Sequence, residues 1–246
     1  MRRPKESLEI NLNKDALINI DYRLDANGKR VEALPLGGAP VKSGSVEVLF
    51  DGIEDRILRE IEKADAVFGV VAWLTNQALL RALRAKKSSF VVQKEDFLRP
   101  CKGEPAWHST LRTLYSGRSG MSRFETPAHN LTTSGGDEIE RTRCAGLAGG
   151  RRDSGIPRIH HKFAVFARAE PRRMGRGEFC HYEPYTVVTG SFNWTQNANR
   201  SRENLVIIHD PEISEGYWEE WARVIAISEP LNWEHSWIEP EWRIGT

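Results

Sequence analysis

The chain has 246 residues, of which 39% are hydrophobic and 28% are charged, with a formal net charge of +1 at pH 7. This length allows one sizeable core, and the composition is that of an ordinary globular protein. The longest apolar run, Ala66 to Leu74, has nine residues, whereas a membrane-spanning helix needs about 20. The first dozen residues lack the apolar block of a secretory signal. We therefore expect a cytoplasmic protein that has no membrane helix.

The three cysteines, Cys101, Cys144 and Cys180, are widely spaced. They cannot all pair with one another, and no two of them have the Cys-x-x-Cys spacing that is typical of zinc sites. We expect free thiols, no disulfide framework and no metal site.

The N-terminal part of the chain reads as a hairpin followed by a linker. Asn27-Gly28 stands between two partly alternating runs in residues 17–34, which is the strongest short-range hairpin signal. Glycine and proline then recur over residues 37–44. We therefore predict a hairpin extension and linker over residues 1–44, before the main domain.

The main domain begins with alternating strand and helix patterns. Apolar residues recur at helical spacing over 53–61 and 79–83, and apolar strand-like runs occupy 66–73 and 90–92. This alternation indicates a largely parallel sheet covered by helices.

The periodicity is then lost over residues 100–157, which we interpret as a long irregular insertion. Strands are predicted again over 159–166, 185–189 and 205–208, and Pro211 opens a predicted helix.

The main domain is therefore predicted over residues 45–210 and a C-terminal helix and tail over 211–246. Tryptophans recur from Trp218 to Trp242. Because aromatic residues are enriched at protein contacts, we interpret them as a docking or dimer surface.

Two segments carry residues suited to phosphoryl chemistry. His160 and Lys162 are two apart on an apolar strand, so both project from one face, and His161 points to the other. Ser191 and Asn193 are likewise two apart and follow Gly190, which lets backbone and ligand approach closely. A phosphoryl group needs this set: a fixed cation, neutral donors and an imidazole that attacks or moves a proton.

The order His-x-Lys, then Gly-Ser-x-Asn, then Glu-Asn before an apolar strand resembles the phospholipase D superfamily. The resemblance implies an α/β fold with a phospholipase D-like mixed β-sheet flanked by helices. It also implies that His160 is the nucleophile, Lys162 the phosphate clamp, and Ser191 and Asn193 phosphate ligands. Glu203 would be the carboxylate that orients the imidazole. The chain departs from the signature at Ala167, where the family has a supporting aspartate.

The resemblance also implies a second copy of the chain, because the family's active site uses two facing histidines and this sequence carries one motif. We therefore expect a homodimer with one shared site. One His160 would form a phosphohistidine, and the other would protonate the leaving oxygen and then activate water. That scheme needs no metal and no other cofactor.

The expected substrate is a nucleic acid, with DNA favoured over RNA, because residues 141–176 hold ten Lys or Arg against two acids. The predicted activity is therefore that of an endonuclease. The residues predicted to bind nucleic acid are Arg151, Arg152, Arg158, Arg172, Arg173, Arg176 and Trp194; for Trp194, core packing is the alternative. Two other functions stay open. One is a phospholipid phosphodiesterase or transphosphatidylase, and the other is a catalytically weak nucleic-acid-binding protein.

Overall fold

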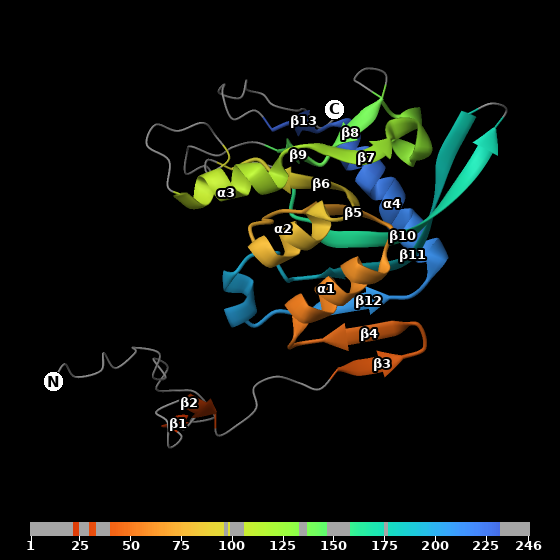
Figure 1. Cartoon of the computed structure of the whole chain (residues 1–246). Coiled ribbons are helices and arrows are strands. Elements are labelled where there is room, and N and C mark those ends of the chain that lie inside the picture. Colours follow the sequence, from red (N-terminus) through yellow and green to blue (C-terminus); the bar gives the residue numbers. More distant parts are fainter. Residues whose placement is uncertain are drawn as a thin grey trace. The chain divides into compact units, whose positions relative to one another are not determined.

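The computed structural model (Figure 1) describes residues 22–24, 30–32, 40–95, 98, 106–132, 137–146, 158–174 and 177–231. The chain divides into two compact units, residues 1–38 and residues 39–246. In the first unit, β1 (Tyr22–Leu24) pairs antiparallel with β2 (Arg30–Glu32). The predicted N-terminal hairpin is therefore confirmed, although its Asn27-Gly28 turn lies outside the described residues.

The second unit is built on a sheet with the strand order β13-β9-β6-β5-β10-β11-β12-β4-β3. These strands are β3 (Val41–Ser43), β4 (Val46–Leu49), β5 (Ala66–Val71), β6 (Lys87–Gln93), β9 (Thr142–Ala145), β10 (Lys162–Met174), β11 (Gly177–Gly190), β12 (Leu205–Ile208) and β13 (Glu229–Pro230). Only the β5–β6 and β6–β9 pairs are parallel. The sheet is therefore mixed, and its parallel part is smaller than the alternating pattern predicted.

Helices cover both faces of this sheet (Figure 1). Helices α1 (Ile53–Lys63), α2 (Gln77–Arg84) and α3 (Ala106–Tyr115) lie on one face, and α4 (Pro211–Ala226) lies on the other. A hydrophobic core lies on each face of the sheet, and β10 contributes to both. Phe166 packs in the core with α1 and α2, whereas the neighbouring Val165 packs in the core with α4. Because central strands are buried on both faces, they read as continuous apolar runs rather than alternating ones.

Two segments are more regular than the sequence predicted. Residues 41–43, assigned to the linker, form edge strand β3, which turns into β4 through Gly44 at φ +55°. The described part of the irregular insertion contains helix α3, strand β9 and a small sheet of β7 (Arg118–Ser122) and β8 (Glu138–Glu140). It also contains two short 3-10 helices, η2 (Arg123–Glu125) and η3 (Pro127–Asn130). Strands as short and polar as β7 and β8 carry too few apolar residues to show a period in the sequence.

Helix α4 begins where the sequence predicted. The Asp210 side chain accepts a hydrogen bond from the Ile213 N–H, and Pro211 occupies the first turn. Trp221 is fully buried against Phe68, with ring centroids 4.8 Å apart, and Trp218 is also buried. These two tryptophans belong to the core, so assigning them to a docking surface was wrong. The tail from residue 232 lies outside the described residues.

Strands β10 and β11 continue past their neighbours as a two-stranded arm (Figure 1). Strand β5 pairs with β10 only up to Ala167, and β12 pairs with β11 only from Val187. We call residues 168–174 and 177–183 the hairpin arm. None of the described helices is long and apolar enough to cross a bilayer.

Candidate active site

The five predicted catalytic residues meet at one edge of the sheet. Lys162, the first residue of β10, lies opposite Val71, the last residue of β5. Gly190, the last residue of β11, lies opposite Leu205, the first residue of β12. His160 and Lys162 therefore stand at the start of β10, beside Ser191 and Asn193 just after β11 and Glu203 just before β12. Alternating strand direction explains how segments about 30 to 40 residues apart reach the same edge.

His160 and Lys162 are in contact. The Lys162 Nζ lies 3.3 Å from Nδ1 and 3.4 Å from Nε2 of His160, and it donates a hydrogen bond to the His160 carbonyl oxygen at 3.0 Å. His160 is exposed, whereas Lys162 is only 8% exposed. Burial lowers the pKa of the Lys162 ammonium, and the negative charge of Glu203 acts in the opposite direction. A buried cation beside an exposed imidazole suits the binding of an anion.

Ser191 and Glu203 are joined by a hydrogen bond in which the hydroxyl donates to the carboxylate. The Ser191 N–H donates to Asn204 Oδ1 at 2.9 Å, and the Asn204 N–H donates to Ser191 Oγ at 3.0 Å. A Cβ on Gly190 would lie 2.3 Å from the Asn204 carbonyl oxygen, so only glycine fits between these two segments. The expected bond from Glu203 to His160 is replaced in this structure by the bond to Ser191.

The loop after Asn193 is anchored in the core. Trp194 is 0% exposed and packs against Phe90, with ring centroids 5.6 Å apart. Its carbonyl oxygen accepts a hydrogen bond from the Asn76 N–H at 2.9 Å, and Asn76 Nδ2 donates to Glu54 at 2.8 Å. Glu54 also accepts a hydrogen bond from Asn199 in the short helix η4 (Asn197–Arg200). Trp194 offers no exposed face to a base, so the packing alternative is correct for this residue.

Asn193 itself is partly buried and carries an unpaired atom. Its Oδ1 is buried and has no hydrogen-bond partner in the described part of the chain. A buried amide oxygen without a donor is unfavourable. The side chain is therefore poised for a ligand or a neighbouring molecule that can donate to it.

Trp73 lies next to His160 and is connected to Glu95 and Arg158; of these three residues, the sequence linked only Arg158 to binding. The Trp73 ring meets the His160 ring edge to face, with centroids 6.3 Å apart and planes at 86°. Trp73 Nε1 donates to Glu95 Oε1 at 3.1 Å, and Arg158 Nη1 lies 3.2 Å from the same oxygen. Trp73 and Glu95 follow the parallel strands β5 and β6. The carboxyl ends of parallel strands are where ligands bind in open α/β sheets, and this signal could have identified both residues.

The other predicted nucleic-acid-binding residues that the structure describes lie away from His160. Arg172 and Arg173 are in the hairpin arm, roughly 35 Å along β10 from Lys162 at about 3.3 Å per residue. Arg172 lies 3.4 Å from Glu183, and Arg173 lies 3.2 Å from Glu178. The strand therefore carries both arginines to its far end, where acids face them, and their binding of nucleic acid stays a prediction. Arg151, Arg152 and Arg176 lie outside the described residues.

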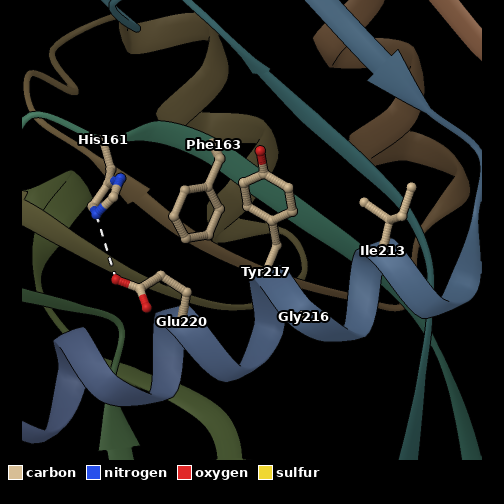
Figure 2. Close-up of a pocket in the computed structure, with 6 residues that line it drawn as sticks. All are labelled: His161, Phe163, Ile213, Gly216, Tyr217 and Glu220. Carbon is tan, nitrogen blue, oxygen red and sulfur yellow. Dashed lines mark ion pairs between the residues drawn. The ribbon is translucent and has the colours of Figure 1, made fainter.

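His161 lies on the opposite face of β10 from Lys162, as the strand period predicted. It lines a shallow pocket of about 260 Å³ on the α4 side, together with Phe163, Ile213, Gly216, Tyr217 and Glu220 (Figure 2). His161 Nε2 is 3.5 Å from Glu220 Oε1, and the His161 side chain is 47% exposed. None of the predicted catalytic side chains lines this pocket.

Comparison with known proteins agrees with the motifs. The model of the family described as cardiolipin synthase, PLD-like domain, matches residues 127–225. The chain is 26% identical over 212 residues to an uncharacterized protein of Acanthamoeba polyphaga mimivirus. This alignment covers 79% of this chain and 70% of that protein. It is 29% identical over 147 residues to the mitochondrial cardiolipin hydrolase of Mus musculus, covering 59% of this chain and 56% of that protein.

Among solved structures, NucT from Helicobacter pylori superposes with a TM-score of 0.44 at 12% identity, covering 75% of this chain and 98% of that one. The family match contains the His-x-Lys and Gly-Ser-x-Asn motifs, which stand at the same edge of the sheet. Residues 127–225 are therefore similar to a phospholipase D-like domain, and the predicted resemblance to the phospholipase D superfamily is confirmed.

Proposed function

We propose that the protein is a phosphodiesterase that cleaves nucleic acid through a covalent phosphohistidine. The observation that carries this proposal is the exposed His160 imidazole within 3.4 Å of the buried Lys162 ammonium, at the edge that also holds Ser191. A phosphodiester seated there finds a nucleophile, a fixed positive charge and hydroxyl and amide groups around one phosphorus atom.

In the first proposed step, a nitrogen of His160 attacks phosphorus. A P–N bond forms while the bond to the leaving oxygen breaks, and that oxygen takes a proton from a second imidazole. In the second step the same imidazole removes a proton from water. The water oxygen then displaces His160, which restores the free enzyme. Lys162 balances the charge on the non-bridging oxygens in both steps.

The second imidazole is proposed to be His160 of a second copy of the chain. One His-x-Lys motif supplies one imidazole, while attack and leaving-group protonation need groups on opposite sides of the phosphorus. Two supports are available: the exposure of His160 and the unpaired Asn193 Oδ1. A two-fold axis beside His160 would complete the site.

Nucleic acid is proposed as the substrate because the exposed Arg158 guanidinium pairs with Glu95, which also binds Trp73, the ring beside His160. From there Arg158 can bind a phosphate next to the scissile one. The second candidate is a phospholipid, favoured by the match to proteins named mitochondrial cardiolipin hydrolase. DNA rather than RNA, and a cytoplasmic location, stay predictions.

The test is a substrate panel in EDTA: single-stranded DNA, duplex DNA, RNA and cardiolipin vesicles. We expect the wild type to cleave nucleic acid and His160→Ala to be inactive. His161→Ala is the matched control, because it removes the neighbouring imidazole from the other face of the strand and should stay active. Cleavage of cardiolipin alone would favour the second candidate, and loss of activity in EDTA would contradict the metal-independent scheme.

A further inference from the structure

The surface next to His160 contains an aromatic ring that the proposed chemistry does not use. Trp73 is partly exposed and directly follows the buried residues at the end of β5. The Ala72 N–H donates to the His161 carbonyl oxygen at 2.9 Å, so this loop is fixed to the segment that carries His160. The ring centroids of Trp73 and His160 are 6.3 Å apart.

The position of the indole is fixed by a carboxylate. Glu95 Oε1 accepts the indole N–H at 3.1 Å and also lies 3.2 Å from Arg158 Nη1. The one polar atom of the ring is thus paired, and the surface that remains available is the apolar π-system. Arg158 is 43% exposed, so its guanidinium presents further donors beside the ring.

The strand order places this group on one side of the phosphate position. Reading across the edge, Glu95 follows β6 and Trp73 follows β5, then come His160 and Lys162 before β10 and Ser191 after β11. A phosphate held at Lys162 therefore has the serine on its β11 side and the indole on its β5 side. The group attached to the phosphate on that side reaches Trp73.

We propose that Trp73 is a specificity residue that stacks on the nucleobase next to the scissile phosphate, while Arg158 binds the following phosphate. This inference rests on the proposed nuclease function and adds to it a reason for substrate choice. Every nucleobase has a planar face, which an acyl chain or a glycerol lacks, and stacking on a protein ring is tolerant of base identity. A base that stacks on Trp73 has left its own stack, so the preferred substrate is single-stranded at this position.

The experiment is a double-mutant cycle between protein and substrate. The substrate is a short oligonucleotide with a single phosphodiester among phosphorothioate linkages, which resist cleavage but keep the negative charge that Arg158 would bind. The nucleotide on either side of the phosphodiester is intact or abasic. We measure kcat/KM for the wild type, Trp73→Ala and Trp73→Phe. Phe124→Ala is the matched control, because Phe124 is 57% exposed and lies 4.8 Å from the Arg123 guanidinium outside this site.

We expect Trp73→Ala to lower kcat/KM on the intact substrate by roughly 5- to 150-fold, the range of one base-stacking contact. On one of the two abasic substrates, the wild type and Trp73→Ala should be equally slow. Trp73→Phe should retain part of the wild-type kcat/KM on the intact substrate, because its ring can still stack. This variant also controls for misfolding of the alanine variant. Phe124→Ala should match the wild type.

An equal loss on intact and abasic substrates would overturn the inference, because it would mean that Trp73 only positions His160. If the wild type cleaves no oligonucleotide, the proposed function fails and the inference fails with it. If the wild type cleaves the intact substrate and both abasic substrates at the same rate, the inference alone fails.

Discussion

Gly190 is the position where a single methyl group tests the geometry of the site. It ends β11 directly before Ser191, and its Cα faces the backbone of β12. A Cβ there would lie 2.3 Å from the carbonyl oxygen of Asn204 and 3.1 Å from the Cα of Leu205. Both neighbours are backbone atoms, so no side-chain rotation relieves the contact.

The size of the effect follows from that distance. The contact to the carbonyl oxygen is about 1 Å shorter than the 3.4 Å at which ordinary contact begins, so β11 and β12 must separate by about this amount. The shift moves Ser191 away from Asn204 and Glu203. Overpacking of this kind costs about 1–3 kcal/mol of folding free energy. A displacement of about 1 Å at a catalytic group costs on the order of 100-fold in rate.

The assay compares Gly190→Ala with Gly216→Ala by urea denaturation and by kcat/KM. A Cβ at Gly216, in the middle of α4, meets nothing within 4 Å, so that variant should gain about 0.5–1 kcal/mol and stay active. Gly190→Ala should lose both stability and about 100-fold in kcat/KM. A Gly190→Ala variant with wild-type activity would refute the argument that the backbone at this position fixes Ser191.

Three further predictions follow from single contacts. Burial lowers the pKa of Lys162 and its charged form binds phosphate, so activity should be lost with rising pH below the range of an ordinary lysine. In a pH–rate profile, Lys162→Arg should move this alkaline limb to higher pH. An unmoved limb would contradict phosphate binding by the charged Lys162. In anisotropy titrations, Arg158→Glu should weaken nucleic-acid binding and reduce the slope of log affinity against log salt concentration by about 0.7–0.9. Arg173→Glu in the hairpin arm should change neither the affinity nor this slope. The reverse pattern would favour the basic tract as the binding surface. Trp194→Ala should lower the free energy of unfolding by about 3–5 kcal/mol in urea denaturation, and a near-neutral result would contradict its place in the core.

The parts of the fold that the sequence predicted correctly are those with a strong local signal. The run from Ala66 to Val71 is buried on both faces, so it appears as a continuous apolar strand. Helix α4 was predicted from Pro211, which occupies its first turn. The two-residue period of β10 placed His160 and Lys162 on one face and His161 on the other, because side-chain direction in a strand depends only on sequence parity.

The parts that were missed depend on contacts between distant segments. Trp73 and Arg158 meet at Glu95, which is 22 residues from one and 63 from the other, and no local pattern records that meeting. The basic tract was predicted from charges counted along the chain, and its binding of nucleic acid stays a prediction. The register of β10 against β11 places Glu178 beside Arg173, and cross-strand pairing of this kind is visible only once the sheet is formed.

The central claim is that His160 forms a covalent bond to the substrate phosphorus. The most direct measurement mixes the enzyme with a uniformly labelled oligonucleotide in EDTA, quenches in alkali within one turnover, and maps the label by mass spectrometry. We expect a phosphoramidate on His160 in the wild type and in His161→Ala, and none in His160→Ala. Cleavage of the oligonucleotide by the wild type without any label on His160, or label retained by His160→Ala, would contradict it.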